Sequence, residues 1–81
     1  MIRLYADFNN FDEDGTLPLT CRGSIDSIAA LGRELHEGEE VVLTHQELEV
    51  IARVFRNMDG YWEARSDTWN FVDVTASISG V

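Results

Sequence analysis

Two Asp-Gly pairs, Asp14-Gly15 and Asp59-Gly60, constrain the fold more than any other feature of this sequence. The Asp-Gly dipeptide favours the tight turns that join antiparallel strands. Both pairs stand close to runs in which apolar and polar residues alternate, and such alternation is typical of a strand with one buried face. The sequence therefore predicts short strands connected by tight turns.

The first two strands are expected on either side of the first turn. Residues 2–8 carry an apolar side chain at every second position. After a turn over residues 9–15 the alternation resumes over residues 17–21, so we expect the two strands to form a hairpin. Pro18 lies within the second strand and cannot donate a ladder hydrogen bond, which places this strand at a sheet edge or gives it a bulge.

An amphipathic helix of about three turns is expected after the second strand. Ser24 is a favourable N-cap, Asp26 suits the positive end of the helix dipole, and Gly38 is placed to end the helix. The residues that recur at three- and four-residue spacing are Ile25, Ile28, Leu31, Gly32 and Leu35. A third strand is expected over residues 40–45, because this stretch contains a run of three aliphatic residues.

The segment from Thr44 to Met58 is compatible with two structures. As a helix, it would be capped by Thr44 with Glu47 three residues later, the spacing of a capping box. As a strand, its β-branched and aromatic residues would turn at residues 57–60 and pair with residues 61–65. We favour the hairpin, because it also explains the second Asp-Gly pair.

The complete sequence predicts one small α+β domain over residues 1–74. A short last strand is expected over residues 69–74, and the small polar residues 75–81 are expected to fray. A chain of 81 residues allows one domain. The predicted fold is a small bent antiparallel sheet or a partly open SH3-like β-barrel with one α-helix, in the order β-β-α-β-β-β.

The charge of the chain restricts its partners. Six arginines and no lysine oppose fifteen acidic residues, which gives a formal net charge of −9. Nucleic acids and anionic membranes are bound largely through basic side chains, so direct binding to either is not expected. Another protein, with a basic surface, is the expected partner, and the acidic residues of 12–14 and 37–40 are the expected points of first contact.

The sequence contains no signal for a membrane or for export. No apolar run approaches the roughly 20 residues of a membrane span, and the N-terminal residues lack the apolar region of a signal peptide. The single cysteine, Cys21, cannot form an internal disulfide. We expect a cytoplasmic protein.

Most of the chain resembles a group of short bacterial proteins without an assigned function. The resemblance rests on residues 3–10 (RLYADFNN), the acidic turn with Gly15, residues 21–24 (CRGS), and Glu37-Gly38 before a valine-rich strand. These motifs mark turns and element ends, so the resemblance implies a fold and transfers no site.

A weaker similarity is to eukaryotic SH3 domains. Residues 4–8 (LYADF) resemble their first strand, and residues 59–65 (DGYWEAR) resemble the hairpin that carries their ligand-stacking tryptophan. The sequence departs from that family, because a helix replaces the acidic loop region and no Pro-x-x-Tyr follows. This similarity implies a small barrel and no peptide site.

Outward-facing aromatic residues are the candidates for a binding surface. Tyr5, Tyr61 and Trp69 fall on the outer face of their strands or near an end. If the strands of Tyr5 and Tyr61 are neighbours, these rings form a patch rimmed by carboxylates, of the kind that binds protein or peptide. The predicted binding residues are Tyr5, Tyr61, Trp69, Asp12, Asp14, Glu37, Glu39 and Glu40.

Residue patterns for catalysis or metal binding are weak. Residues 10–15 match the first half of an EF-hand calcium loop, but Cys21 stands at the twelfth position, which requires a bidentate glutamate. The spacing of Cys21, His36 and His45 matches no zinc motif. We therefore expect no catalytic residue, no metal and no cofactor.

The function predicted from the sequence is that of a non-enzymatic protein-binding or regulatory module. One alternative is an acidic inhibitor or decoy that occupies the nucleic-acid channel of a basic protein. It requires rows of carboxylates on one face. A second alternative is a weak calcium-binding module that uses the turn at residues 10–15.

Overall fold

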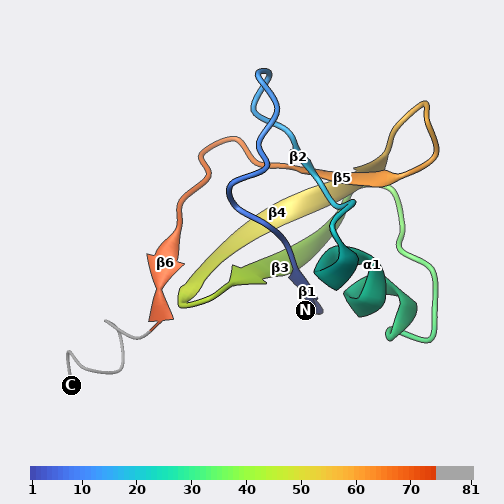
Figure 1. The fold of residues 1–81 in the computed structure, drawn as a ribbon, viewed down its shortest axis with the longest axis horizontal. Helices are drawn as coiled ribbons and strands as arrows, with labels where there is room; N and C mark the ends of the chain where they lie inside the picture. The colour runs from blue at the N-terminus through green and yellow to red at the C-terminus, as the bar shows by residue number, and fades with distance from the viewer. Residues whose placement is uncertain (75–81) are drawn as a thin grey trace.

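Six strands form one sheet beside a single helix in the computed structural model, which describes residues 1–74 (Figure 1). In chain order the elements are β1 (Arg3–Tyr5), β2 (Leu17–Pro18), α1 (Arg22–Ala29), β3 (Glu39–His45), β4 (Leu48–Arg56), β5 (Trp62–Arg65) and β6 (Val72–Asp73). The order across the sheet is β1-β3-β4-β5-β2, and β6 also pairs with β4. The α+β class is confirmed, with one strand more than the predicted order β-β-α-β-β-β contains, and β6 lies within the strand expected over residues 69–74. The predicted fraying of residues 75–81 lies outside the described residues.

The sheet is mixed, not antiparallel, and it is not closed into a barrel. β1 pairs in parallel with β3, with Leu4 opposite Leu43, so the predicted hairpin of the first two strands is wrong. β2 pairs instead with β5 at the opposite edge, with Leu17 opposite Ala64. Alternation determines which face of a strand is buried but leaves the choice of neighbour to long-range contacts.

The β3–β4 and β4–β5 hairpins confirm the strand interpretation of residues 44–58. Alternate residues of both central strands face the core, where Val41 lies opposite Ala52 and Leu43 opposite Val50. The capping-box helix does not form, because β3 turns into β4 at Gln46, whose φ is +54°. The core consists of Leu4, Ala6, Leu17, Leu19, Leu35, Val41, Leu43, Val50, Ala52, Val54 and Ala64.

The helix is shorter than predicted. Its N-cap residue is Cys21, and the predicted cap, Ser24, lies inside the helix and is fully buried. The predicted end at Gly38 is also wrong, because the C-cap is Ala30 and Gly32 follows with a φ of +73°. A left-handed glycine just beyond the last turn is a common helix stop, and here it outweighs the apolar spacing that continues to Leu35.

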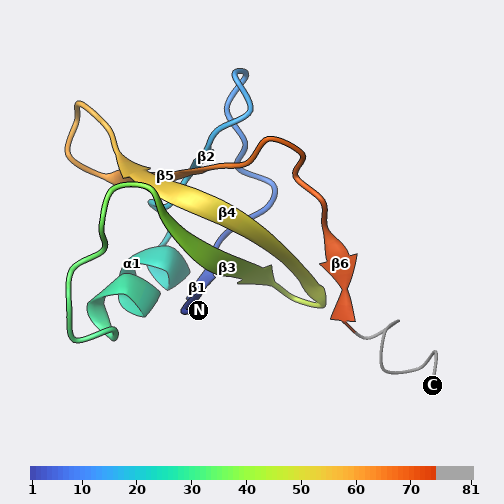
Figure 2. The same cartoon turned by 180° about the vertical axis from the view of Figure 1, so that it is seen from behind.

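Both outer strands are protected from pairing with another chain. The prediction of an edge position for Pro18 is confirmed, and its missing N–H removes a donor from β2. At the other edge, α1 lies beside β1 (Figure 2). The Ser24 hydroxyl donates to the Tyr5 carbonyl at 2.6 Å, and the Ser27 hydroxyl accepts from the Tyr5 N–H at 3.1 Å. Two helix serines thus take the place of a neighbouring strand.

Gly23 allows α1 to approach the ring of Tyr5. A Cβ atom at this position would lie 2.4 Å from Cδ1 of that ring. Alanine is a better helix former than glycine by about 1 kcal/mol. We nevertheless expect Gly23→Ala to destabilise the protein by roughly 1–3 kcal/mol in urea unfolding, because the ring must move. In a Tyr5→Ala background the same change should cost nothing, and an equal cost in both backgrounds would contradict this packing.

Candidate functional site

Most of the predicted binding residues lie in separate parts of the molecule. Tyr5 and Tyr61 do not share a patch, because β3 and β4 lie between β1 and β5. Tyr61 follows the β4–β5 turn, and its N–H donates to the Asn57 side chain at 3.3 Å. Residues 12–14 form the first turn and residues 37–40 span the start of β3 (Figure 1), but Asp14 and Glu40 line one shared hollow.

Tyr5 and Trp69 belong to a band of six rings on the surface. We define this aromatic band as Tyr5, Phe8, Phe11, His45, Trp69 and Phe71. Neighbouring ring centroids lie between 4.8 Å (Phe11 and Trp69) and 6.2 Å (Phe11 and Phe71). Sequence reasoning missed Phe11 and Phe71, because only folding brings these distant segments together. Most of the rings meet edge to face, a favourable geometry for aromatic pairs, and Phe8 and Trp69 also pack against the main core.

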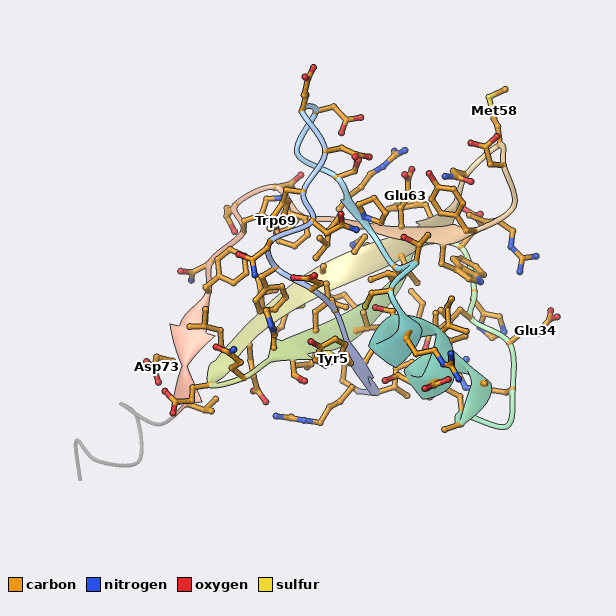
Figure 3. The ribbon with its side chains drawn as sticks, viewed as in Figure 1. Tyr5, Glu34, Met58, Glu63, Trp69 and Asp73 are labelled. Atoms are coloured by element: carbon orange, nitrogen blue, oxygen red, sulfur yellow. The ribbon has the colours of Figure 1, made fainter. Side chains whose placement is uncertain are left out.

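Trp69 fastens this band to the first turn. Its Nε1–H donates to the Gly15 carbonyl at 2.9 Å, and its backbone N–H donates to the Ser66 hydroxyl at 3.0 Å. The φ of Trp69 is +45°, a conformation that non-glycine residues adopt only when their surroundings impose it. Trp69 lies against the N-terminal segment in Figure 3. We conclude that the aromatic band holds the β5–β6 connection in place.

The indole hydrogen bond should be measurable. We expect Trp69→Phe to lower the free energy of unfolding by about 1 kcal/mol, because it leaves the Gly15 carbonyl without its donor. Tyr61→Phe is the control, since the Tyr61 hydroxyl has no bonding partner within residues 1–74. It should change stability by less than about 0.5 kcal/mol in the same urea titration. Equal effects of the two changes would count against the anchoring role of Trp69.

The β5–β6 connection is longer than the sheet requires. β4 pairs at Arg53 with Arg65 and at Glu49 with Val72. Four positions separate these two sites in β4, whereas seven separate their partners, so three residues are surplus. The connection, residues 66–71, arches away from β4 (Figures 1 and 2).

Within the described residues, this arch leaves Ile51 of β4 without a paired strand on the side away from β3. Val42, opposite Ile51, donates its N–H to Ile2 at 2.9 Å, so Val42 and Ile51 are not hydrogen-bonded to each other. The N–H and C=O of Ile51 therefore point away from β3, toward the interval between β5 and β6. Within residues 1–74, neither group has a hydrogen-bond partner.

Two hollows open beside Ile51 on the outer face of the sheet. The larger, about 600 Å³, is lined by Ile51 and by polar and charged side chains that include Arg53 and Arg65. The smaller, about 480 Å³, is lined by Val42, Ile51, Asn70 and Val72 among others. Ile51 is 52% exposed. We call Ile51, its free backbone groups and these two hollows the β4 notch.

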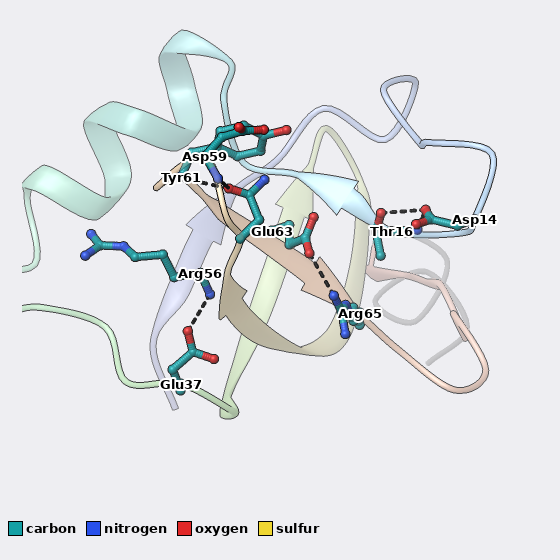
Figure 4. A network of polar contacts seen from close by, with 9 residues as sticks. Asp14, Thr16, Glu37, Arg56, Asp59, Tyr61, Glu63 and Arg65 are labelled. Atoms are coloured by element: carbon teal, nitrogen blue, oxygen red, sulfur yellow. Dashed lines mark hydrogen bonds and ion pairs between the residues drawn. The ribbon is translucent and has the colours of Figure 1, made fainter.

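The two arginines of the larger hollow are bound to neighbours. Arg53 donates to the Gly38 carbonyl at 2.9 Å and lies 3.9 Å from a carboxylate oxygen of Glu40. Arg65 donates to Glu63 at 2.9 Å (Figure 4) and lies over the Phe55 ring. Their positive charges are therefore compensated locally.

Two carboxylates of the larger hollow, Asp14 and Asp67, have no ion-pair partner within 4.0 Å among residues 1–74. Asp14 accepts from the Thr16 hydroxyl at 2.7 Å and from the Thr16 N–H at 3.1 Å (Figure 4). These two hydrogen bonds lower the pKa of Asp14, so its charge is maintained at neutral pH. The larger hollow is thus negatively charged overall.

The carboxylates of residues 37–40 make contacts inside the protein. Glu37 accepts from the N–H of Arg56 at 2.8 Å (Figure 4). Glu39 accepts from the Arg33 guanidinium and from the N–H of His36 at 3.1 Å. These bonds hold the start of β3 and the residues before it in place, so the carboxylates of Glu37 and Glu39 are already engaged within the protein.

The Glu39 contacts make stability depend on pH. The hydrogen bond from Arg33, with a smaller contribution from His36, lowers the pKa of Glu39 from 4.5 to about 2. A lowered pKa stabilises the folded state above pH 4.5, and this contribution is lost as the pH falls toward 2. We expect Glu39→Gln to be less stable than the native sequence at pH 6, with the difference shrinking by pH 2. The control Glu34→Gln should show no such convergence in urea titrations, and a pH-independent deficit for Glu39→Gln would contradict this linkage.

The predicted metal candidates are apart in the fold. Within residues 1–74, no three His, Cys, Asp or Glu side chains are grouped closely enough to hold a metal ion. The Nδ1 of His45 accepts the N–H of Phe8 at 3.2 Å, and the Cys21 sulfur lies 3.2 Å from the Ser24 hydroxyl. Residues 12–16 form a turn closed by the Asp12 N–H, which donates to the Thr16 carbonyl at 2.9 Å.

Comparisons with protein-family models, curated proteins and solved structures found no match for this chain. No helix in the described part of the chain is long and apolar enough to cross a membrane. The resemblances to short bacterial proteins and to SH3 domains therefore stay predictions.

Proposed function

We propose that this protein is a non-enzymatic module that binds another protein at the β4 notch. The observation that carries this proposal is the state of Ile51, which is half-exposed in the longest strand, lies between two hollows and has free backbone groups. An apolar centre surrounded by polar, hydrogen-bonding groups is the usual composition of a protein interface.

The charge of the protein supports a basic partner. The net charge of −9 attracts a positively charged protein from a distance, and Asp14 and Asp67 give the notch the same sign locally. Such attraction increases the association rate and weakens as salt screens the charges. Binding is therefore strongest at low ionic strength.

A pair of lysine variants tests this function. Ile51→Lys places a cation in the apolar part of the notch, whereas Met58→Lys makes the same change in charge at the tip of the β4–β5 turn, where Met58 points away from the molecule (Figure 3). We expect the native sequence and Met58→Lys to capture the same proteins from bacterial lysate at low salt. Ile51→Lys should reduce this capture at least tenfold.

The comparison requires that both variants fold. Ile51 and Met58 are 52% and 103% exposed, so neither change should disturb the core, and circular dichroism would verify this. Equal capture by both variants would contradict binding at the notch. Capture no greater than that of an unrelated protein of equal charge would contradict the proposed function as a whole.

A further inference from the structure

We infer that the β4 notch receives an extended, lysine- or arginine-containing segment of the partner, which pairs with the backbone of Ile51 as an additional piece of β-strand. This inference rests on the proposed function and specifies the chemistry of the ligand. It follows from the free backbone groups, the length of the interval in the sheet and the local charge.

The free backbone groups of Ile51 select an extended peptide. One N–H and one C=O of the same strand residue point into the notch, and a partner residue in β conformation offers the complementary acceptor and donor. The two hydrogen bonds would complete the row that Arg53 makes with β5 and Glu49 makes with β6. The ligand would thus fill the only break on this side of β4 within the described residues.

The interval limits the ligand to a short stretch. Glu49 and Arg53 are four residues apart, or roughly 13 Å at the rise of a strand. Because Arg65 and Val72 occupy the positions at either end, about three ligand residues fit in line with them. The central residue has its side chain on the same face as Ile51, where Val42 lies beside it in the smaller hollow. An aliphatic side chain suits this position.

The charge of the larger hollow defines the next ligand position on that face. A residue two positions from the central one lies just beyond the three in-line positions, because Arg65 is paired with Arg53 there. The ligand backbone therefore leaves the row of β4 at this point, and a long side chain reaches the larger hollow, which Ile51 and Arg53 both line. Asp14 and Asp67 line that hollow without an ion-pair partner among residues 1–74. A lysine or arginine at this position therefore complements the site.

A second copy of this chain does not meet these requirements. Two copies, each with a net charge of −9, repel each other. The arginines are also engaged within the chain, five in ion pairs and Arg56 over the ring of Trp62. The basic segment therefore comes from another protein.

Amide hydrogen exchange tests the free state. We expect the Ile51 amide to exchange at least tenfold faster than those of Val50 and Ala52, whose N–H groups point toward β3. Equal protection of the three amides in the free protein would overturn the inference, because the notch would then have no free donor.

A synthetic peptide tests the bound state. The probe is N-acetylated, C-amidated Lys-Ala-Val-Ala-Lys, with an aliphatic centre and lysines two residues away. Titrated into the full chain, it should slow exchange of the Ile51 amide and shift the NMR signals of Ile51 and Thr68. The same peptide methylated on the valine nitrogen, and Glu-Ala-Val-Ala-Glu, should bind at least tenfold more weakly, the first for lack of a donor and the second for its charge.

The outcomes separate this inference from the proposed function. Equal binding of the native and N-methylated peptides, or no signal change at millimolar peptide, would overturn strand pairing by a basic segment. If Ile51→Lys still abolished protein capture in that case, binding at the notch would stand with another mode of recognition. If Ile51→Lys left capture unchanged, the proposed function itself would fail.

Discussion

The pairing of β3 with β4 is the constraint on which the rest of the structure depends. Seven residue pairs join these two strands, from Glu39 opposite Val54 to His45 opposite Leu48. Their inner faces supply five core residues, and every other strand except β2 pairs directly with one of them. Because a buried strand face must be covered, α1 and the segments around it take their positions from this pair.

The β4 notch is a consequence of how the β5–β6 connection is held. The aromatic band fixes the β5–β6 connection on the N-terminal segment, and the indole hydrogen bond to Gly15 sets the position of Trp69. A direct connection would have allowed continuous pairing along β4. The three surplus residues prevent it, so a structural cluster of rings leaves a backbone donor and acceptor open at Ile51.

The positive charges of the chain are mostly paired within the protein, whereas two negative charges at the notch have no ion-pair partner within residues 1–74. Five arginines form ion pairs with nearby carboxylates, and most of these pairs lie on the surface, where each contributes little to stability. Three of these arginines, Arg3, Arg53 and Arg65, lie on strands, and their ion pairs compensate positive charge on the sheet. The remaining carboxylates, among them Asp14 and Asp67 at the notch, then dominate the field that a partner meets.

Local features of the sequence determined the turns, the buried face of β1, the edge position of Pro18 and the hairpin at residues 57–60, because neighbouring residues encode these properties. Tyr5 was also recognisable as a surface aromatic, whereas Trp69 is partly buried against the core. Only the tertiary structure decided that β1 pairs in parallel with β3 and that the Ser24 hydroxyl bonds the Tyr5 carbonyl at the edge of β1. The tertiary structure also decided that the backbone groups of Ile51 have no strand among residues 1–74 to pair with on the side away from β3. These features depend on contacts between segments far apart in the chain, and alternation carries no information about which segments meet.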